Sequence, residues 1–323
     1  MKTRTKSWLM IAAILLLIGC ILFAGTMSML GWDFTKFSTV QYETNTYQIN
    51  GTFQNVSIST DTVDIIFTVS DDETCIVDCY EEEKTRHSVT VENDTLIIKL
   101  IDERTITDNI HYIGINIGTP RITIQLPETK YASLFIEEST GDIDIPRDFS
   151  FKDVDISIST GDVRFCATAS GLTCIKGSTG DIRIENTTVG SLDLSVSTGD
   201  VIVSDVICES DVIVGVSTGK ALLTDITCQN LTSRGNTGDL SLENVIAAGN
   251  FMIQRSTGDI TLKNSDACDL FIQTDTGDIT GTLLTEKIFF VQTNTGDVEV
   301  PQTTTGGKCE INTDTGDVTF TID

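Results

Sequence analysis

A Thr-Gly pair that returns every 19 or 20 residues constrains this sequence more than any other feature. It occurs ten times at that spacing, often within the word Ser-Thr-Gly-Asp. The repeat glycines are Gly141, Gly161, Gly180, Gly199, Gly219, Gly238, Gly258, Gly277, Gly296 and Gly316. A regular period indicates stacked structural units, and this period is too short for units built from helical hairpins. The repeat therefore predicts either a β-solenoid or a long β-meander.

Apolar residues occupy four fixed positions in each repeat, which we call lanes: seven and five residues before the glycine, and two and four residues after it. Around Gly199 the lanes hold Leu192, Leu194, Val201 and Val203. The residues between them are mostly polar, so each repeat contains two short strands with one apolar face. Like residues stack on like residues when each repeat is one coil of a solenoid, whereas a meander would leave one face bare or close into a large barrel. We therefore predict an all-β fold, a parallel β-helix or β-solenoid of about ten coils of 19 or 20 residues each.

The turn chemistry agrees with this fold. Glycine takes the third position of Ser-Thr-Gly-Asp, where a type II turn requires a positive φ angle, and the polar neighbours can bond nearby backbone amides. We therefore assign all ten repeat glycines to structural turns. We also expect the coils to stack in sequence order, so that the last one, which ends in Asp-Thr-Gly-Asp-Val-Thr-Phe-Thr-Ile-Asp, is the uncapped end.

An uncharged segment of 25 residues, from Trp8 to Trp32, precedes the repeats. As a helix it would be about 37 Å long, enough to cross a bilayer with some tilt. The basic residues before it predict a single-pass protein of the cell membrane, with a cytoplasmic N-terminus and an extracellular C-terminal region. The alternative is a lipoprotein, because Leu-Ile-Gly-Cys ending at Cys20 resembles a lipidation signal. We favour the retained helix, since the apolar run continues beyond Cys20.

The chain divides into five segments on these criteria. They are a cytoplasmic tail (1–7), a transmembrane helix (8–32), a linker (33–50), irregular N-terminal β coils that also cap the solenoid (51–130), and the regular repeat solenoid (131–323).

The composition is strongly acidic, with 47 Asp and Glu against 21 Lys and Arg and a formal net charge of −26. Such a surface repels nucleic acids and anionic lipid headgroups and favours cations. Nucleic acids are therefore excluded as partners.

The repeats and three upstream segments resemble a known family. The segments are VSISTDTVDIIFTVSDDETCIVDCYEEE, LIIKL and RITIQLPETKYASLFIEESTGDIDI. They resemble the "putative adhesin" β-strand-repeat domains of unknown function that occur in membrane-anchored proteins of Gram-positive bacteria. The resemblance covers roughly residues 50 to 323 and implies a β-helix at the cell envelope, with no established chemistry.

Three functions follow from this reading. The first is a non-enzymatic adhesin or interaction surface that contacts an envelope protein or a glycan. The second is an accessory sensor or scaffold in an envelope stress response, because one type of family member belongs to such an operon. The third is a carbohydrate-active β-helix enzyme, by analogy with polysaccharide lyases. Only the third requires catalytic residues, and we assign none, since no nucleophile motif, phosphate loop or zinc signature is present.

An aspartate follows the glycine in nine of the ten repeats. These are Asp142, Asp162, Asp181, Asp200, Asp239, Asp259, Asp278, Asp297 and Asp317. In a parallel stack neighbouring carboxylates would lie about 4.8 Å apart and repel one another. We expect hydrogen bonds from backbone amides and hydroxyls to offset this repulsion; the alternative is Ca²⁺ bound between coils. Lys220 replaces the aspartate in the fifth repeat and would break a row of metal ions.

The cysteines and histidines are weak indications of a metal-binding or catalytic site. We expect most of the nine cysteines to be buried as small apolar residues, and Cys75 and Cys79 form a weak metal signal because no histidine is near them in sequence. We expect His87 and His111 to be solvated loop residues.

Two further pairs of residues, one of cysteines and one of arginines, stand out within the repeat region. Cys208 and Cys228 stand at equivalent positions of adjacent coils, at a separation that a disulfide can span. Arg234 and Arg255 interrupt the even pattern of repeated carboxylates near Gly238 and Gly258, and we assign both to a solvated strand edge.

Overall fold

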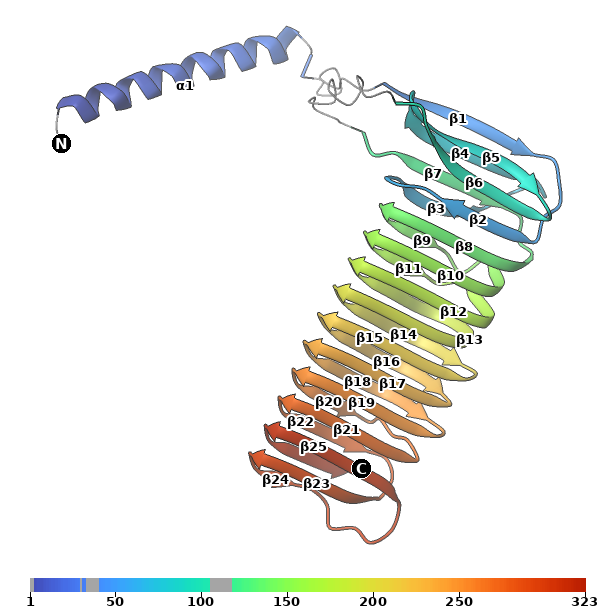
Figure 1. Ribbon diagram of the computed structural model, residues 1–323, viewed down its shortest axis with the longest axis vertical. Coiled ribbons are helices and arrows are strands. Elements are labelled where there is room, and N and C mark those ends of the chain that lie inside the picture. The colour runs from blue at the N-terminus through green and yellow to red at the C-terminus, as the bar shows by residue number, and fades with distance from the viewer. Residues whose placement is uncertain (1–2, 30, 33–40, 105–117) are drawn as a thin grey trace.

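The computed structural model describes residues 3–29, 31–32, 41–104 and 118–323, with side chains from residue 8 onward (Figure 1). Helix α1 spans Thr3–Met29, so it begins inside the segment predicted as a cytoplasmic tail. Its part from Trp8 to Met29 has a mean hydropathy of 2.7, and all of its residues except Met27 are exposed. By length and composition alone this helix could cross a membrane or act as a signal sequence.

The described residues after the helix form one hydrogen-bonded sheet of 26 strands wound into a solenoid. Each coil contributes one strand to each of two rows, and both rows run along the whole solenoid (Figure 1). In spatial order the first row is β5 (Thr85–Glu92), β6 (Thr95–Asp102), β2 (Asn55–Ser59), β8 (Lys130–Thr140), β10 (Ser150–Thr160), β12 (Thr168–Thr179), the second half of β13 (Ile182–Thr198), β15 (Asp211–Thr218), β17 (Asn230–Thr237), β19 (Asn250–Thr257), β21 (Asp269–Thr276), β25 (Gly307–Thr315) and β23 (Lys287–Thr295). The second row is β1 (Tyr42–Ile49), β4 (Cys75–Glu82), β7 (Arg121–Leu126), β3 (Asp64–Val69), β9 (Ile143–Ile145), β11 (Val163–Phe165), the first half of β13, β14 (Val201–Cys208), β16 (Ala221–Cys228), β18 (Leu240–Ala247), β20 (Ile260–Lys263), β22 (Ile279–Leu283), β26 (Val318–Ile322) and β24 (Val298–Glu299). The prediction of a β-solenoid of about ten coils is confirmed.

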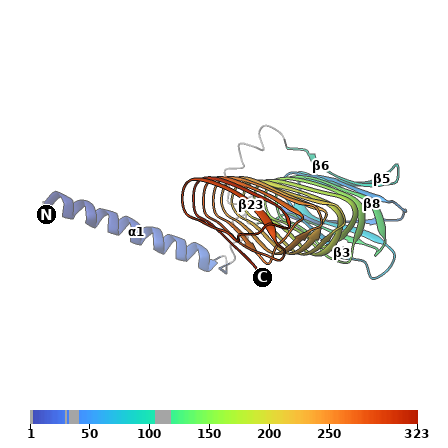
Figure 2. The same ribbon diagram turned by 90° about the horizontal axis from the view of Figure 1, so that it is seen from below.

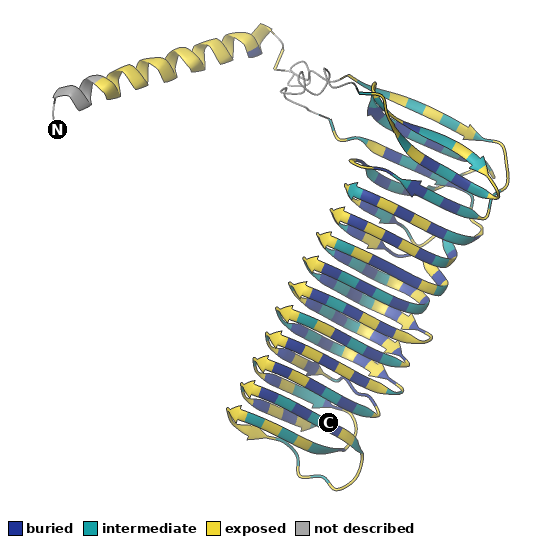
Figure 3. Ribbon diagram, viewed as in Figure 1, coloured by how far each residue is buried: buried dark blue, intermediate teal, exposed yellow. Residues whose placement is uncertain are grey.

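The four apolar lanes form the core, as the sequence predicts. Buried and exposed positions alternate along the strands (Figure 3), and the coils superpose around one interior when viewed from below (Figure 2). The lane two residues after the glycine shows this best, because its members from Ile143 onward are at most 1% exposed, apart from Val298. One continuous hydrophobic core therefore runs through the molecule.

The repeat glycines do lie at corners, but the corner differs from a type II turn. Their φ angles lie between 125° and 152°, well beyond the value of about 80° that a type II turn requires. At Gly199 a Cβ atom would also lie 2.0 Å from the carbonyl oxygen of Gly180 in the preceding coil. Glycine is therefore required both by the backbone angle and by the close approach of adjacent coils.

A second corner was not predicted. It is formed by Asn or Asp residues six positions after the glycine, and five of them have φ angles between 49° and 55°. These residues are Asn186, Asp205, Asp225, Asn244 and Asn264. Asn and Asp tolerate this left-handed conformation better than other non-glycine residues, so their recurrence at one offset was the signal that marks the corner.

The N-terminal strands cap one end of the solenoid. The coil β2–β3 stacks directly on the first regular coil β8–β9, where Val56 pairs with Leu134 and Ile65 with Ile143. Beyond it, β6 and β5 extend the first row, and β7, β4 and β1 extend the second, partly with antiparallel pairing. The hairpin from β4 to β5 joins the two rows, so that the inner faces of these two strands look toward each other across the core.

The other end departs from sequence order. The C-terminal coil β25–β26 lies between β21–β22 and β23–β24, so the expectation that it forms the open end is wrong. Gly281 of β22 pairs with Phe320 of β26, and a Cβ atom on Gly281 would lie 2.2 Å from the Phe320 ring. The missing side chain at Gly281 thus leaves room for this particular ring. The coil β23–β24 becomes the end of the solenoid.

Candidate functional site

The aspartate column is a ladder of hydrogen bonds between coils. In eight of the regular coils the backbone amide of the residue after the glycine donates to the Oδ1 atom of the aspartate in the neighbouring coil, at 2.7 to 3.2 Å; the amide of Asp239 is the exception, because Lys220 stands in the coil before it. Eight of the nine predicted aspartates accept such a bond, and Asp297 stands at the end of the column. The bonds from Asp317 to Asp278 and from Asp297 to Asp317 follow the spatial order of the coils. Asp64 of the cap begins the column, since it accepts from the amide of Asp142, and the sequence repeat did not reveal it.

Lys220 changes the charge of the column in its middle. Its own amide donates to Asp200, and its ammonium group lies 3.4 Å from Oδ2 of Asp239. Arg183 similarly contacts both Asp162 and Asp181. Amides and cationic side chains thus account for the ladder with the residues present. Ca²⁺ bound between the coils stays an untested alternative.

Arg255 lies in the core, and its assignment to a solvated strand edge is wrong. Only 3% of the residue is exposed, and its Nη2 atom donates to Oγ of Ser233 at 3.0 Å, while Nε and Nη1 have no hydrogen-bond partner. Burial lowers the pKa of the guanidinium to about 10, with Asp239 acting in the opposite direction. Gly235 supplies the space, because a Cβ there would meet Nη1 at 1.6 Å. Arg234, by contrast, is exposed as expected.

The cysteines are mostly buried, as expected. Seven of the nine are buried, Cys20 and Cys268 are exposed, and all are free thiols. Cys208 donates weakly to the carbonyl oxygens of Gly190 and Asp211, and burial raises the pKa of both Cys208 and Cys228. These two residues pack as small apolar groups in this structure. Cys20 lies on α1, where the lipidation alternative stays untested.

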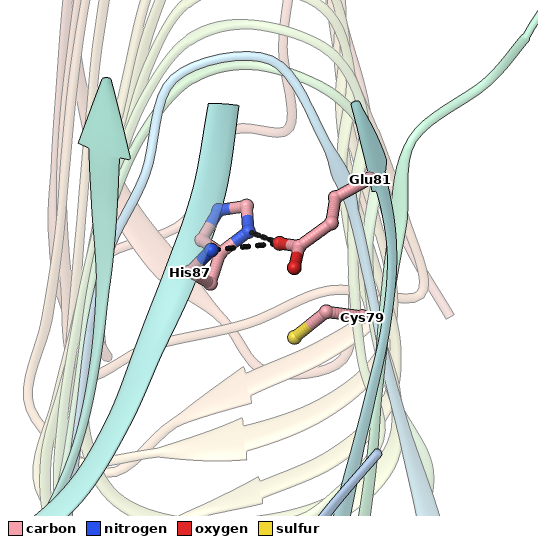
Figure 4. A group of neighbouring side chains, drawn as sticks. All are labelled: Cys79, Glu81 and His87. Carbon is pink, nitrogen blue, oxygen red and sulfur yellow. Dashed lines mark hydrogen bonds and ion pairs between the residues drawn. The ribbon is translucent and has the colours of Figure 1, made fainter. Parts of the chain in front are cut away.

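A cluster of three different metal-ligand types lies in the cap (Figure 4). Cys79 and Glu81 stand two residues apart in β4 and therefore point to the same inner face, toward His87 of β5. A ligand atom from each of the three residues lies within 4.8 Å of the other two, and all three residues are buried. Among the described residues this is the one group of three or more such side chains that could hold a metal ion. The expectation of a solvated His87 is wrong, and His111 lies outside the described residues.

Hydrogen bonds fix each member of this cluster. Oε2 of Glu81 accepts from the backbone amide of His87 and bonds its Nδ1 atom, both at 2.7 Å, while Oε1 accepts from the side-chain amide of Asn45 at 2.7 Å. The other ring nitrogen of His87 bonds Oγ1 of Thr60 at 2.7 Å. Burial, together with Glu81 and Asp78, raises the pKa of the Cys79 thiol to about 12. The cluster is thus pre-organised around a neutral thiol. The signal that sequence reasoning missed was Cys-x-Glu in one strand facing a histidine in the next.

A hollow of about 240 Å³ opens beside the cluster. Thr60, Glu81 and His87 belong to its lining, together with Asp61 and Glu82. Solvent therefore has access to the cluster from a side that also carries carboxylates. Cys79 lies deeper and is fully buried.

The end coil β23–β24 exposes core residues. Val298 is 46% exposed, whereas its lane equivalents in the other regular coils are at most 1% exposed. Phe289 and Val291 are only partly buried. β23 pairs with β25 and β24 with β26, and no other described strand covers their outer edges. β23 carries no charged residue after Lys287, whereas the exposed Asp297 and Glu299 flank Val298 at β24.

Comparisons with known proteins agree with the resemblance found in the sequence. A model of the family "Toastrack DUF4097" matches residues 53–214 and 209–323. No curated protein matches the chain. The chain is similar in fold to a solved structure described as a putative adhesin from Parabacteroides distasonis, with 10% identity, 83% of this chain and 97% of that chain covered, and a TM-score of 0.43.

Two further solved structures are similar at the same level. A protein described as a putative adhesin from Bacteroides fragilis has 14% identity and a TM-score of 0.39, covering 87% of this chain and 97% of its own. A protein described as a putative lipid binding protein from Parabacteroides distasonis has 14% identity and a TM-score of 0.41, covering 85% and 96%. The Gram-positive source that the sequence resemblance implies stays a prediction.

Proposed function

Because this chain belongs to the Toastrack DUF4097 family, and because its repeats serve to build a rigid solenoid, we propose that it is a non-enzymatic, membrane-anchored interaction protein of the cell envelope. Helix α1 is the anchor, and the solenoid projects outside the cell. The cap follows the helix in the chain, so the coil β23–β24, at the opposite end of the solenoid, is the part farthest from the membrane (Figure 1).

The exposed end coil is the observation that carries this proposal. Solenoids normally end in a cap with a polar outer face, because an open coil leaves both unpaired backbone groups and apolar side chains in water. Here the N-terminal end has such a cap, while Val298 at the other end is 46% exposed. The open end coil therefore serves as a contact surface.

The occupant that fits this end is a second copy of the chain. An extended peptide would cover the edge of one strand, whereas another open coil has the same outline and covers β23 and β24 together. The partly buried Phe289 and Val291 and the exposed Val298 of one copy then pack against the same group of residues in the other copy, and the strand edges pair. Two anchored copies that meet end to end project from opposing membranes, which is a homophilic adhesive contact.

Full-length protein in nanodiscs that hold one chain each tests this proposal. We expect wild-type discs to form bridged pairs, visible as a doubled mass in light scattering and as paired discs in electron microscopy. Since each helix stays in its own disc, pairing through α1 does not contribute. Val298→Asp places a charge on the contact surface and should weaken pairing by about a hundredfold or more.

Ile207→Asp is the matched control, because Ile207 is 58% exposed on the side of the solenoid and lies away from the end coil. It should pair as the wild type does. Wild-type discs that stay single, or Val298→Asp discs that pair normally, would refute the end-to-end contact. A membrane protein of the same cell that cross-links to Val298 in place of a second copy would instead favour the sensor alternative.

A further inference from the structure

Three chemically different donors converge inside the cap. They are the Cys79 sulfur, the Glu81 carboxylate and the Nδ1 atom of His87, and they come from two strands that belong to different rows of the solenoid. Thiolate, imidazole and carboxylate are together the donor set that zinc and related transition-metal dications prefer, whereas Ca²⁺ and Mg²⁺ require oxygen donors. The donor chemistry therefore selects a metal of the zinc class.

The charges of the three donors match a dication. A thiolate and a carboxylate together carry two negative charges, and a neutral imidazole adds none, so the loaded site would be neutral. Neutrality matters here because Cys79, Glu81 and His87 are at most 4% exposed, and a net charge at that depth would be costly.

The groups around the donors are those that orient ligands in metal sites. A metal-bound histidine usually donates its second ring N–H to a fixed acceptor, and Oγ1 of Thr60 lies 2.7 Å from Nε2 of His87. The Glu81 carboxylate is held in place by the Asn45 side chain and by the amide of His87, both at 2.7 Å. Tetrahedral binding requires that Oε2 of Glu81 and Nδ1 of His87, now 2.7 Å apart, separate to about 3.3 Å.

The hollow beside the cluster supplies the entry path. Glu81 and His87 line it, and the other charged groups of the lining are the carboxylates of Asp61 and Glu82 and the guanidinium of Arg104, so that carboxylates outnumber cationic groups along the path. Because the protein offers three ligands, water from this hollow can complete a tetrahedral site. Three protein ligands with one open position is the arrangement of zinc sites that exchange ligands, while closed structural sites use four.

We propose that Cys79, Glu81 and His87 form a binding site for one transition-metal dication of the zinc class, with its fourth position open toward the hollow. On binding, the Cys79 thiol releases its proton to solvent, and the His87 ring proton moves from Nδ1 to Nε2, where it is donated to Thr60. One proton is therefore released for each ion bound. The ion links β4 to β5 and so fixes the two rows of the solenoid to each other at the cap.

Metal titration of the chelator-treated, full-length protein tests this site. We expect one Zn²⁺ per chain, and release of one proton per ion as judged by calorimetry in buffers of different ionisation enthalpy. Co²⁺ in the same site should give a thiolate-to-metal absorption band, which reports directly on the Cys79 sulfur. Zn²⁺ should also raise the melting temperature of the protein.

Cys79→Ser should lose the Co²⁺ band and weaken Zn²⁺ binding by about a hundredfold or more. Cys75→Ser is the matched control, because Cys75 is equally buried on the same inner face of β4 but is not a member of the cluster. Absence of wild-type binding, or a Co²⁺ band that persists in Cys79→Ser, would overturn the proposal. If Cys79→Ser does not fold, the stoichiometry, the proton release and the band of the wild type decide the question.

Discussion

Replacing Arg255 should make the protein more stable, which is unusual for a change in a core. Its guanidinium lies inside the solenoid with a single hydrogen bond, from Nη2 to Ser233. A buried charge that forms no ion pair is destabilising, and removing it together with its polar atoms removes the penalty. Methionine is the suitable replacement, since it is unbranched and of similar length.

The pKa of Arg255 gives the size of the effect. A folded-state pKa of about 10, against an ordinary value of 12.5, corresponds to a penalty of about 3 kcal/mol on the charged form. The pKa is lower in the folded state, so the penalty is complete at neutral pH and decreases only as the pH rises from about 10 to 12.5. Losing the bond to Ser233 offsets about 1 kcal/mol. We therefore expect Arg255→Met to raise the free energy of unfolding by about 2 kcal/mol.

Thermal unfolding and hydrogen exchange measure this gain. A gain of about 2 kcal/mol in a chain of this size raises the melting temperature by about 5 °C. Because solenoids open locally, amide exchange should slow most in β17 and β19, the strands that hold Ser233 and Arg255. Arg234→Met on the exposed face of β17 is the control and should change stability by less than about 0.5 kcal/mol.

A destabilised Arg255→Met variant would refute this reasoning. It would mean that the guanidinium makes a favourable interaction that the hydrogen bonds and charges around it do not reveal. A gain equal to that of Arg234→Met would show instead that only the loss of positive charge matters.

Three further predictions follow from the corners and the core. Gly199→Ala should destabilise the protein by about 3 kcal/mol in urea unfolding, because its Cβ would meet a backbone oxygen at 2.0 Å, whereas Gly215→Ala, with 3.6 Å of space, should be nearly neutral. Burial raises the pKa of Glu138 to about 8 from 4.5, so its contribution to stability is complete below pH 4.5 and is lost as the pH rises to about 8; Glu138→Gln should abolish that part of the pH dependence of unfolding. Millimolar Ca²⁺ should leave the melting temperature of the chelator-treated protein unchanged, because amides already bind the aspartate column, and a rise would support Ca²⁺ between the coils.

The fold could be predicted from the sequence because each apolar lane occurs in all ten repeats. A single pair such as Leu192 and Leu194 is compatible with many strands, but the same spacing in every unit leaves the solenoid as the simplest way to bury all lanes. The glycine corner followed from the same repetition. The left-handed corner at Asn186 and its equivalents carried an equally regular signal of Asn or Asp at one offset, and apolar residues alone could not reveal it.

The cap and its cluster could not be predicted in this way, because they occur once. His87 lies eight residues after Cys79 in sequence, and their approach depends on β4 and β5 entering different rows and facing each other across the core. An unrepeated histidine gives no indication of burial. Arg255 was missed for a related reason, since the small residue that accommodates it, Gly235, lies in the neighbouring coil.

The order in which the last coils stack could not be predicted from the repeat. Identical lanes make every coil an acceptable neighbour for every other coil, so the repeat specifies what a coil is without specifying which coil it contacts. The choice then depends on the few positions where lanes differ in size. Gly281 leaves a gap that Phe320 fills, and this match stabilises the C-terminal coil beside β22 and leaves the coil 287–299 at the end. If this is the deciding contact, Gly281→Val should clash with Phe320 and favour stacking in sequence order, which would bury Val298 and expose Val318 to hydrogen exchange.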